Sequence, residues 1–193
     1  MIRDLILKNR SYRRFNESIS IPTEKLLEWL ELARFSASAS NKQPLKYIVS
    51  NQPETNEKIF ECLAWAGYLK DWTGPEEGER PTAYIIILRD RTITNNAGID
   101  PGIAAQSILL GAVEDGFGGC MLGAINRPKL DANMGILDNF ETMLVLALGS
   151  PNENVILEDV EPSGDIKYYR DQEDNHYVPK RTMDELILQQ YTE

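Results

Sequence analysis

Apolar residues along this chain recur with helical spacing in some segments and as unbroken runs in others. Pro22 stands at a first-turn position before apolar residues three and four apart, which predicts a helix over residues 22–35. The apolar run from Tyr84 to Leu88 predicts a strand buried on both faces. The other expected elements are a short first helix over residues 2–9, strands at 47–49, 118–125 and 143–148, and helices at 53–66, 130–134 and 182–190, the last with Met183, Leu186 and Ile187 inward.

A second long helix is expected from Asp100 to Asp115, with Asp100 as its N-cap, Pro101 at its first position and Gly116 as its stop. Its apolar residues leave little polar surface, so this helix should lie at the centre of the domain. Alternating helices and strands of this kind predict an α/β or α+β fold around one mixed central sheet flanked by helices. Neither G-x-G-x-x-G after a strand nor G-x-x-x-x-G-K-[ST] occurs, which disfavours the simple doubly wound nucleotide-binding fold.

The composition changes near the C-terminus. Residues 149–179 are acidic and polar, contain prolines and show no amphipathic period. A polar stretch of this length either wraps over its own domain or reaches a partner. We therefore expect residues 1–193 to form a single domain, with residues 150–193 as a C-terminal extension.

Acidic residues outnumber basic ones by 30 to 20, which gives a net charge of −10. Nucleic acid and anionic membrane surfaces are then poor partners, because both require an extended basic face. No apolar run approaches the roughly 18 residues that span a bilayer, and the N-terminus does not resemble a secretory signal. These features predict a cytoplasmic protein.

The sequence gives little support for a metal site or for the catalytic triad of a hydrolase. The two cysteines, Cys62 and Cys120, lie far apart and should be buried, and His176 is the only histidine. A zinc site, a disulfide framework and a Ser-His-Asp triad are all disfavoured, and we expect no metal. If the protein is an enzyme, an organic cofactor should carry the difficult chemistry.

A basic cluster near the N-terminus contrasts with the acidic chain. Lys8, Arg10, Arg13 and Arg14 lie within seven residues, together with the hydroxyl of Ser11. Charged and planar donors in this arrangement suit a phosphate. A solvated loop is the alternative, because charge runs alone are weak evidence of function.

Six short motifs occur along the chain in an informative order. Together they make the chain resemble the nitroreductase family of FMN-dependent enzymes over nearly its whole length. The motifs are Arg10-Ser11-x-Arg13-x-Phe15, Ser38-Ala39-x-Asn41-x-Gln43-Pro44, Ala105-Gln106-x-x-Leu109, Gly116-Phe117-Gly118, Leu148-Gly149-x-Pro151 and Lys180-Arg181.

This resemblance implies an α+β fold that forms an intimate homodimer with two FMN sites across the subunit interface, and residues 150–193 should contact the partner subunit. It implies two-electron, ping-pong transfer from NADH or NADPH through FMN to nitroaromatics, quinones or similar acceptors.

By the same resemblance, Arg10 and Ser11 hold the FMN phosphate and ribityl chain, and Arg13 acts at the N1 and C2 carbonyl edge of the flavin as the catalytic residue. Reduced flavin carries negative charge at that edge, which a cation stabilises. The remaining implied cofactor-binding residues are the loop Ser38, Ala39, Asn41 and Gln43 from the neighbouring subunit, the strand end Leu122, Gly123 and Ala124, and the C-terminal phosphate clamp Lys180 and Arg181.

Two positions depart from the family pattern. Asn9 stands where many members have a second arginine, and Ala37 where they have a proline. Arg14 and Lys42 are expected to be surface charges. Three alternatives stay open: other FMN chemistry on this fold (dehalogenation, flavin fragmentation or heterocycle oxidation), a flavin-binding regulatory or storage protein without turnover, and an acidic interaction module without a cofactor.

Overall fold

The structure is a computed structural model that describes residues 1–192. The chain divides into two compact units. The first comprises Met1–Trp65 and Gly74–Asn152, and the second comprises Ala66–Thr73 and the chain from Glu153 onward. Each unit is described separately below.

A four-stranded sheet forms the middle of the first unit, with strand order β1-β2-β4-β3 and antiparallel neighbours throughout. The Ser11–Gly119 bridge adds a parallel contact at the β3 edge. The sheet and its flanking helices confirm the expected α+β fold. The strands are β1 (Leu45–Ser50), β2 (Ala83–Asp90), β3 (Gly118–Leu122) and β4 (Phe140–Gly149).

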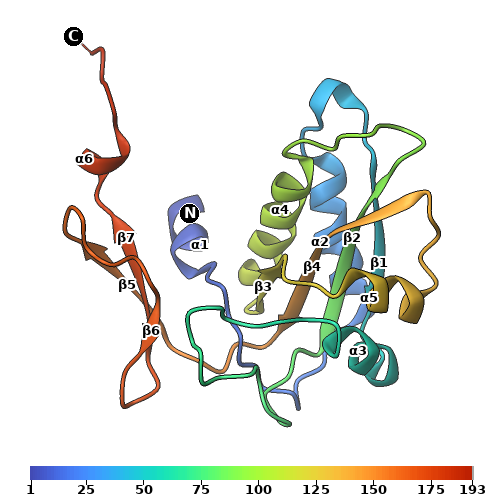
Figure 1. Cartoon of the computed structure of the whole chain (residues 1–193), viewed down its shortest axis with the longest axis horizontal. Helices are drawn as coiled ribbons and strands as arrows, with labels where there is room; N and C mark the ends of the chain where they lie inside the picture. Colours follow the sequence, from blue (N-terminus) through green and yellow to red (C-terminus); the bar gives the residue numbers. More distant parts are fainter. Residues whose placement is uncertain (193) are drawn as a thin grey trace. The chain divides into compact units, whose positions relative to one another are not determined.

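Helices cover both faces of this sheet (Figure 1). α2 and α4 pack against each other on one face, whereas α3 and α5 contact each other on the opposite face. The helices are α1 (Ile2–Lys8), α2 (Thr23–Phe35), the 3-10 helix η1 (Ala39–Asn41), α3 (Pro53–Phe60), α4 (Asp100–Glu114) and α5 (Arg127–Met134).

β2 is the most buried strand, as its apolar run predicts. Ile85 and Ile87 are fully buried and join the core formed with α2 and α4. Ile86 points to the other face because side chains alternate along a strand, and it is also fully buried. The expectations for a helix over residues 22–35 and for two buried cysteines are likewise confirmed.

Several helix boundaries differ from the sequence expectation, and α5 begins at Arg127 instead of residue 130. Asp100 is not the N-cap of α4: Ile99 occupies that position, and the Asp100 carboxylate accepts hydrogen bonds from another loop. α3 ends at Phe60 instead of continuing to residue 66. The chain beyond it is drawn toward the end of β3, where Ala64 N donates to Ala124 O over 2.9 Å.

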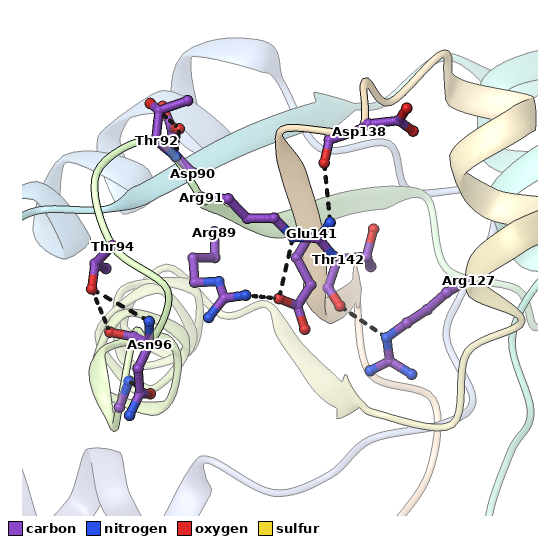
Figure 2. A network of polar contacts seen from close by, with 11 residues as sticks. Arg89, Asp90, Arg91, Thr92, Thr94, Asn96, Arg127, Asp138, Glu141 and Thr142 are labelled. Carbon is purple, nitrogen blue, oxygen red and sulfur yellow. Dashed lines mark hydrogen bonds and ion pairs between the residues drawn. The ribbon is translucent and has the colours of Figure 1, made fainter.

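A bulge in β4 is braced by α5 (Figure 2). The pairing of β2 with β4 shifts at Ile87 and Leu88, which leaves Met143 as the extra residue. Arg127 donates from Nε to Thr142 O over 2.9 Å and from Nη2 to Met143 O over 3.4 Å. Arg127 thereby supplies donors to carbonyls beside the bulge and fixes the start of α5.

The second unit contains a small sheet with strand order β5-β7-β6. Sequence analysis assigns no strand to residues 149–179, and the sheet was missed: β5 pairs in parallel with β7, and β6 pairs antiparallel to β7. Helix α6 is also shorter than expected, and Met183, Leu186 and Ile187 are exposed instead of inward. The elements are β5 (Val155–Val160), β6 (Tyr169–Arg170), β7 (His176–Arg181) and α6 (Met183–Leu186).

Within residues 1–192, no helix combines the length and the apolar character needed to cross a bilayer.

Candidate functional site

The basic segment after α1 lies against the first residues of β3. Ser11 forms a parallel bridge with Gly119, and Tyr12 N donates to Gly119 O over 3.1 Å. The Tyr12 ring packs against Gly118, where an added Cβ would lie 2.6 Å from Tyr12 Cδ2. Gly118 thus allows the segment to approach the sheet closely, whereas the missing side chain of Gly119 leaves room for Ala147, Leu148 and Leu109.

Arg10 is a half-buried cation, and not all of its N–H donors form hydrogen bonds within the protein. Its Nη2 donates to Ile6 O over 2.6 Å, while its buried Nε has no hydrogen-bond partner in the protein. Burial lowers the pKa of Arg10, because removal from water disfavours the charged form. An anion bound here would offset this desolvation, so the residue fits the phosphate of the cofactor that the motifs imply.

The neighbouring arginines have different environments. Arg13 Nη1 donates to Ser11 O over 3.3 Å, which keeps the guanidinium beside the same segment. Arg14 pairs instead with Glu79, Nε to Oε2 over 3.2 Å, and its side chain is only 18% exposed. The expectation that Arg14 is a surface charge is therefore wrong.

Just beyond the end of β3 the chain is exposed to solvent. Leu122 is buried, whereas Gly123 and Ala124 are exposed, and an added Cβ at Gly123 would meet nothing. Gly119 and Gly123 are four residues apart, or about 13 Å along extended chain. The strand edge can therefore accommodate an elongated ligand with its anionic end beside Arg10 and its other end at Gly123 and Ala124.

The loop of Ser38–Gln43 is tied to the first turn of α4. Ser38 Oγ donates to Asp100 Oδ2 over 2.6 Å, and Ala39 N donates to Asp100 Oδ1 over 3.1 Å. Ser38 Oγ in turn accepts from Gln43 N over 2.9 Å. The Ser38 hydroxyl thus organises its own loop.

Three residues of this loop adopt left-handed backbone. Ser40, Asn41 and Gln43 have φ values of 52°, 53° and 49°. Such conformations cost energy in residues other than glycine and persist where surrounding contacts enforce them, often at ligand sites. Asn41 and Gln43 are exposed and available to a ligand.

The loop and the basic segment lie at opposite ends of α4 within one chain (Figure 1). Asp100, at the start of this helix, holds the loop, and Gly119, just after its end, holds Ser11. The 15 residues of α4 span roughly 22 Å. One chain therefore does not bring the two halves of the predicted site together.

Lys180 and Arg181 belong to β7 of the second unit and are exposed. Arg181 Nη1 donates to Glu185 Oε1 over 2.9 Å. Their assignment as a phosphate clamp stays a prediction.

Sequence reasoning gave Tyr12 no role in the site, named Gly118 only within a motif, and named Asp100 only as a helix N-cap. The glycine pair at 118 and 119 is a readable signal, because glycine inside a strand marks close backbone approach. No comparable signal exists for Asp100, whose partner Ser38 lies 62 positions away.

Comparison with known proteins identifies the family to which the chain belongs. The Nitroreductase family model matches residues 6–150, and the chain belongs to this family. The match ends close to the last residue of the first unit, Asn152.

Solved structures show the same fold at low identity. A nitroreductase family protein from Streptococcus pneumoniae TIGR4 is 16% identical, with a TM-score of 0.70, and the match covers 98% of this chain and 100% of that one. A family protein from Clostridium novyi NT is 24% identical, covering 78% of this chain and 86% of that one, with a TM-score of 0.64. An FMN-dependent nitroreductase from Clostridium difficile R20291 is 20% identical, covering 80% and 89%, with a TM-score of 0.65.

Proposed function

We propose that this protein is an FMN-dependent NAD(P)H oxidoreductase that acts by two-electron, ping-pong transfer on nitroaromatics, quinones or similar acceptors. The observation that carries the proposal is the placement of Arg10 and Ser11 against β3, whose far end exposes Gly123 and Ala124. Family membership and the FMN-dependent relative from Clostridium difficile R20291 support it.

Arg10 and Ser11 would hold the phosphate of FMN. Arg10 supplies a desolvated cation, and Ser11 supplies an exposed hydroxyl. Lys180 and Arg181 would add the C-terminal part of this clamp. The clamp suits a terminal phosphate, and the chain has no dinucleotide motif for an adenylate, so FMN is favoured over FAD.

The flavin ring would lie at the open end of β3, against the backbone of Leu122, Gly123 and Ala124. Bound FMN supplies the capacity to take a hydride from NAD(P)H and pass two electrons to the acceptor. The role of Arg13 is electrostatic: its fixed positive charge at the N1 edge would stabilise the negative charge that develops there. No protein acid or base is required at this site.

A homodimer would complete each site. The loop Ser38–Gln43, with Ala39, Asn41 and Gln43, would reach the flavin of the partner subunit, because it lies at the other end of α4 from Arg10 within its own chain. Exposed apolar side chains on α1 and α2 offer surface for such an interface, among them Ile2, Leu7, Leu27 and Phe35. A cytoplasmic location is part of this proposal, and the acidic net charge of the chain is consistent with it.

The absorption spectrum of the purified protein tests the cofactor assignment. We expect a yellow preparation whose released flavin comigrates with FMN and not with FAD. A colourless protein that FMN does not reconstitute would contradict the proposal and leave the interaction-module reading.

A further inference from the structure

Asp100 is the first residue of α4 and is only 4% exposed, which is rare for an aspartate. Its carboxylate accepts from Ser38 Oγ over 2.6 Å and from Ala39 N over 3.1 Å. The N-terminus of a helix favours a negative charge, and the two hydrogen bonds offset part of the desolvation cost. The buried carboxylate thus joins α4 to the start of the loop Ser38–Gln43.

This loop receives little support from packing. Residues 39–43 are exposed, and a cavity of about 240 Å³, lined in part by Asp100, lies beside them. Ser40, Asn41 and Gln43 nevertheless keep left-handed backbone. Residues other than glycine adopt this conformation at a cost in energy, so surrounding contacts have to enforce it. The hydrogen bonds to Asp100 anchor the loop to the rest of the first unit and supply that restraint.

The Ser38 hydroxyl carries the restraint further along the loop. It donates its one proton to Asp100, and its oxygen accepts from Gln43 N over 2.9 Å. Because a hydroxyl has a single proton to donate, Ser38 cannot donate to a ligand at the same time. Ala39 N also donates to Asp100. Both groups therefore serve to shape the loop.

The side-chain amides of Asn41 and Gln43 are the polar groups of the loop that remain for a ligand. Both residues are exposed, and Gln43 Nε2 donates to Asn41 O over 3.2 Å, which orients the Gln43 side chain. An amide side chain both donates and accepts hydrogen bonds, and a flavin ring carries carbonyl acceptors and an N–H donor along one edge. The position of these two amides depends on the left-handed backbone of the loop.

We propose that Asp100 is a positioning residue for the FMN site of the partner subunit. By holding the start of the loop, Asp100 keeps the side chains of Asn41 and Gln43 in the conformation that meets the cofactor. This inference rests on the proposed function, because it assumes that the loop completes a site for FMN.

Titration of the full-length, flavin-free protein with FMN, followed by quenching of the flavin fluorescence, tests this role. Asp100→Ala removes both acceptors and should weaken FMN binding about tenfold. Asp90→Ala is the matched control, because Asp90 is 8% exposed and accepts from Thr92 N over 2.9 Å and from Thr92 Oγ1 over 2.6 Å. It should lower stability to urea by a similar amount and leave the affinity for FMN unchanged.

Ser40→Gly supplies a rescue that a general loss of stability would not show. Ser40 has a φ of 52°, and glycine adopts such backbone without steric cost. Adding Ser40→Gly to Asp100→Ala should therefore restore FMN affinity several-fold. Adding it to Arg10→Ala should restore nothing, because that variant loses a contact to the phosphate and not the shape of the loop.

Hydrogen exchange of the Gln43 amide in the flavin-free protein reports on the loop independently of FMN. Exchange should be faster in Asp100→Ala, because the Ser38 hydroxyl is no longer fixed. The positioning role is overturned if this rate equals that of the wild type, if Asp100→Ala binds FMN like the wild type, or if Asp90→Ala weakens binding equally. A wild type that binds no FMN would instead overturn the proposed function, and the positioning role with it.

Discussion

Arg10 is the single side chain on which the proposed phosphate site depends most. Its guanidinium is half-buried, is held by the Ile6 carbonyl, and retains a buried Nε without a partner. Desolvation of a cation is unfavourable unless an opposite charge or further acceptors offset it. This imbalance is the local reason for placing the phosphate beside Arg10.

Replacement of Arg10 by alanine should weaken FMN binding by roughly 1.5 to 3 kcal/mol, the usual scale for a hydrogen bond to a charged group. Arg181→Ala should have an effect of similar size. Flavin fluorescence quenching measures both, with Arg91→Ala as the control, because Arg91 is an exposed arginine paired with Glu141. Unchanged affinity in both variants would remove the phosphate site from the account.

Arg13 should matter more for the chemistry than for binding. In the proposed site its charge would stabilise the flavin most when the flavin is reduced, so Arg13→Ala should lower the reduction potential and slow reduction by NAD(P)H. FMN affinity should fall less than in Arg10→Ala. Spectroelectrochemical titration and stopped-flow reduction measure these effects, and an unchanged potential would exclude Arg13 from the mechanism.

At the scale of elements, one carboxylate joins the start of α2 to the end of α4. Asp115 Oδ2 accepts from Trp29 Nε1 over 2.8 Å and pairs with Lys25 Nζ over 3.2 Å. The Trp29 hydrogen bond, together with Lys25, holds the pKa of Asp115 below its usual 3.8. These helices carry the central core, so the contact contributes to the stability of the whole first unit.

The stability that Asp115 contributes should depend on pH. A carboxylate whose pKa is lowered by folding stabilises the protein above its unfolded pKa, and this contribution is lost as the pH falls through the lower folded pKa. Asp115→Asn should therefore destabilise the protein at pH 7, by about 1 kcal/mol for a partly exposed site, and the destabilisation should shrink as the pH falls through the lowered pKa. Urea unfolding at several pH values measures the difference in free energy of unfolding between the wild type and Asp115→Asn. If this difference stays the same in acid, the Asp115 carboxylate does not contribute in the way described.

Elements that depend on local pattern were predictable from the sequence. The amphipathic spacing of α2 and the apolar run of β2 specify structure without knowledge of distant residues. The β5–β7 sheet was missed because its strands are short and partly polar, and one contains Pro179. The bonds from Ser38 and Ala39 to Asp100 were equally unpredictable, because they exist only once the loop and α4 are packed together.

At the scale of the whole molecule, the proposed site would require two chains. We expect light scattering to give twice the 21.9 kDa mass of the chain. Phe35 is 68% exposed at the end of α2, and Phe35→Asp should weaken the dimer by about 2 kcal/mol and release FMN. Leu137→Asp is the control, because Leu137 is similarly exposed in the turn before β4. A monomer that holds FMN tightly would refute the shared site.

Anaerobic mixing of the purified, flavin-loaded protein with NADH and with NADPH tests the central claim most directly. The account predicts that at least one nucleotide bleaches the flavin absorbance, and that a quinone or nitroaromatic added afterwards restores it, because both substrates use one flavin in turn. If neither nucleotide bleaches the flavin, the protein binds FMN without acting as an NAD(P)H oxidoreductase, and the account is contradicted.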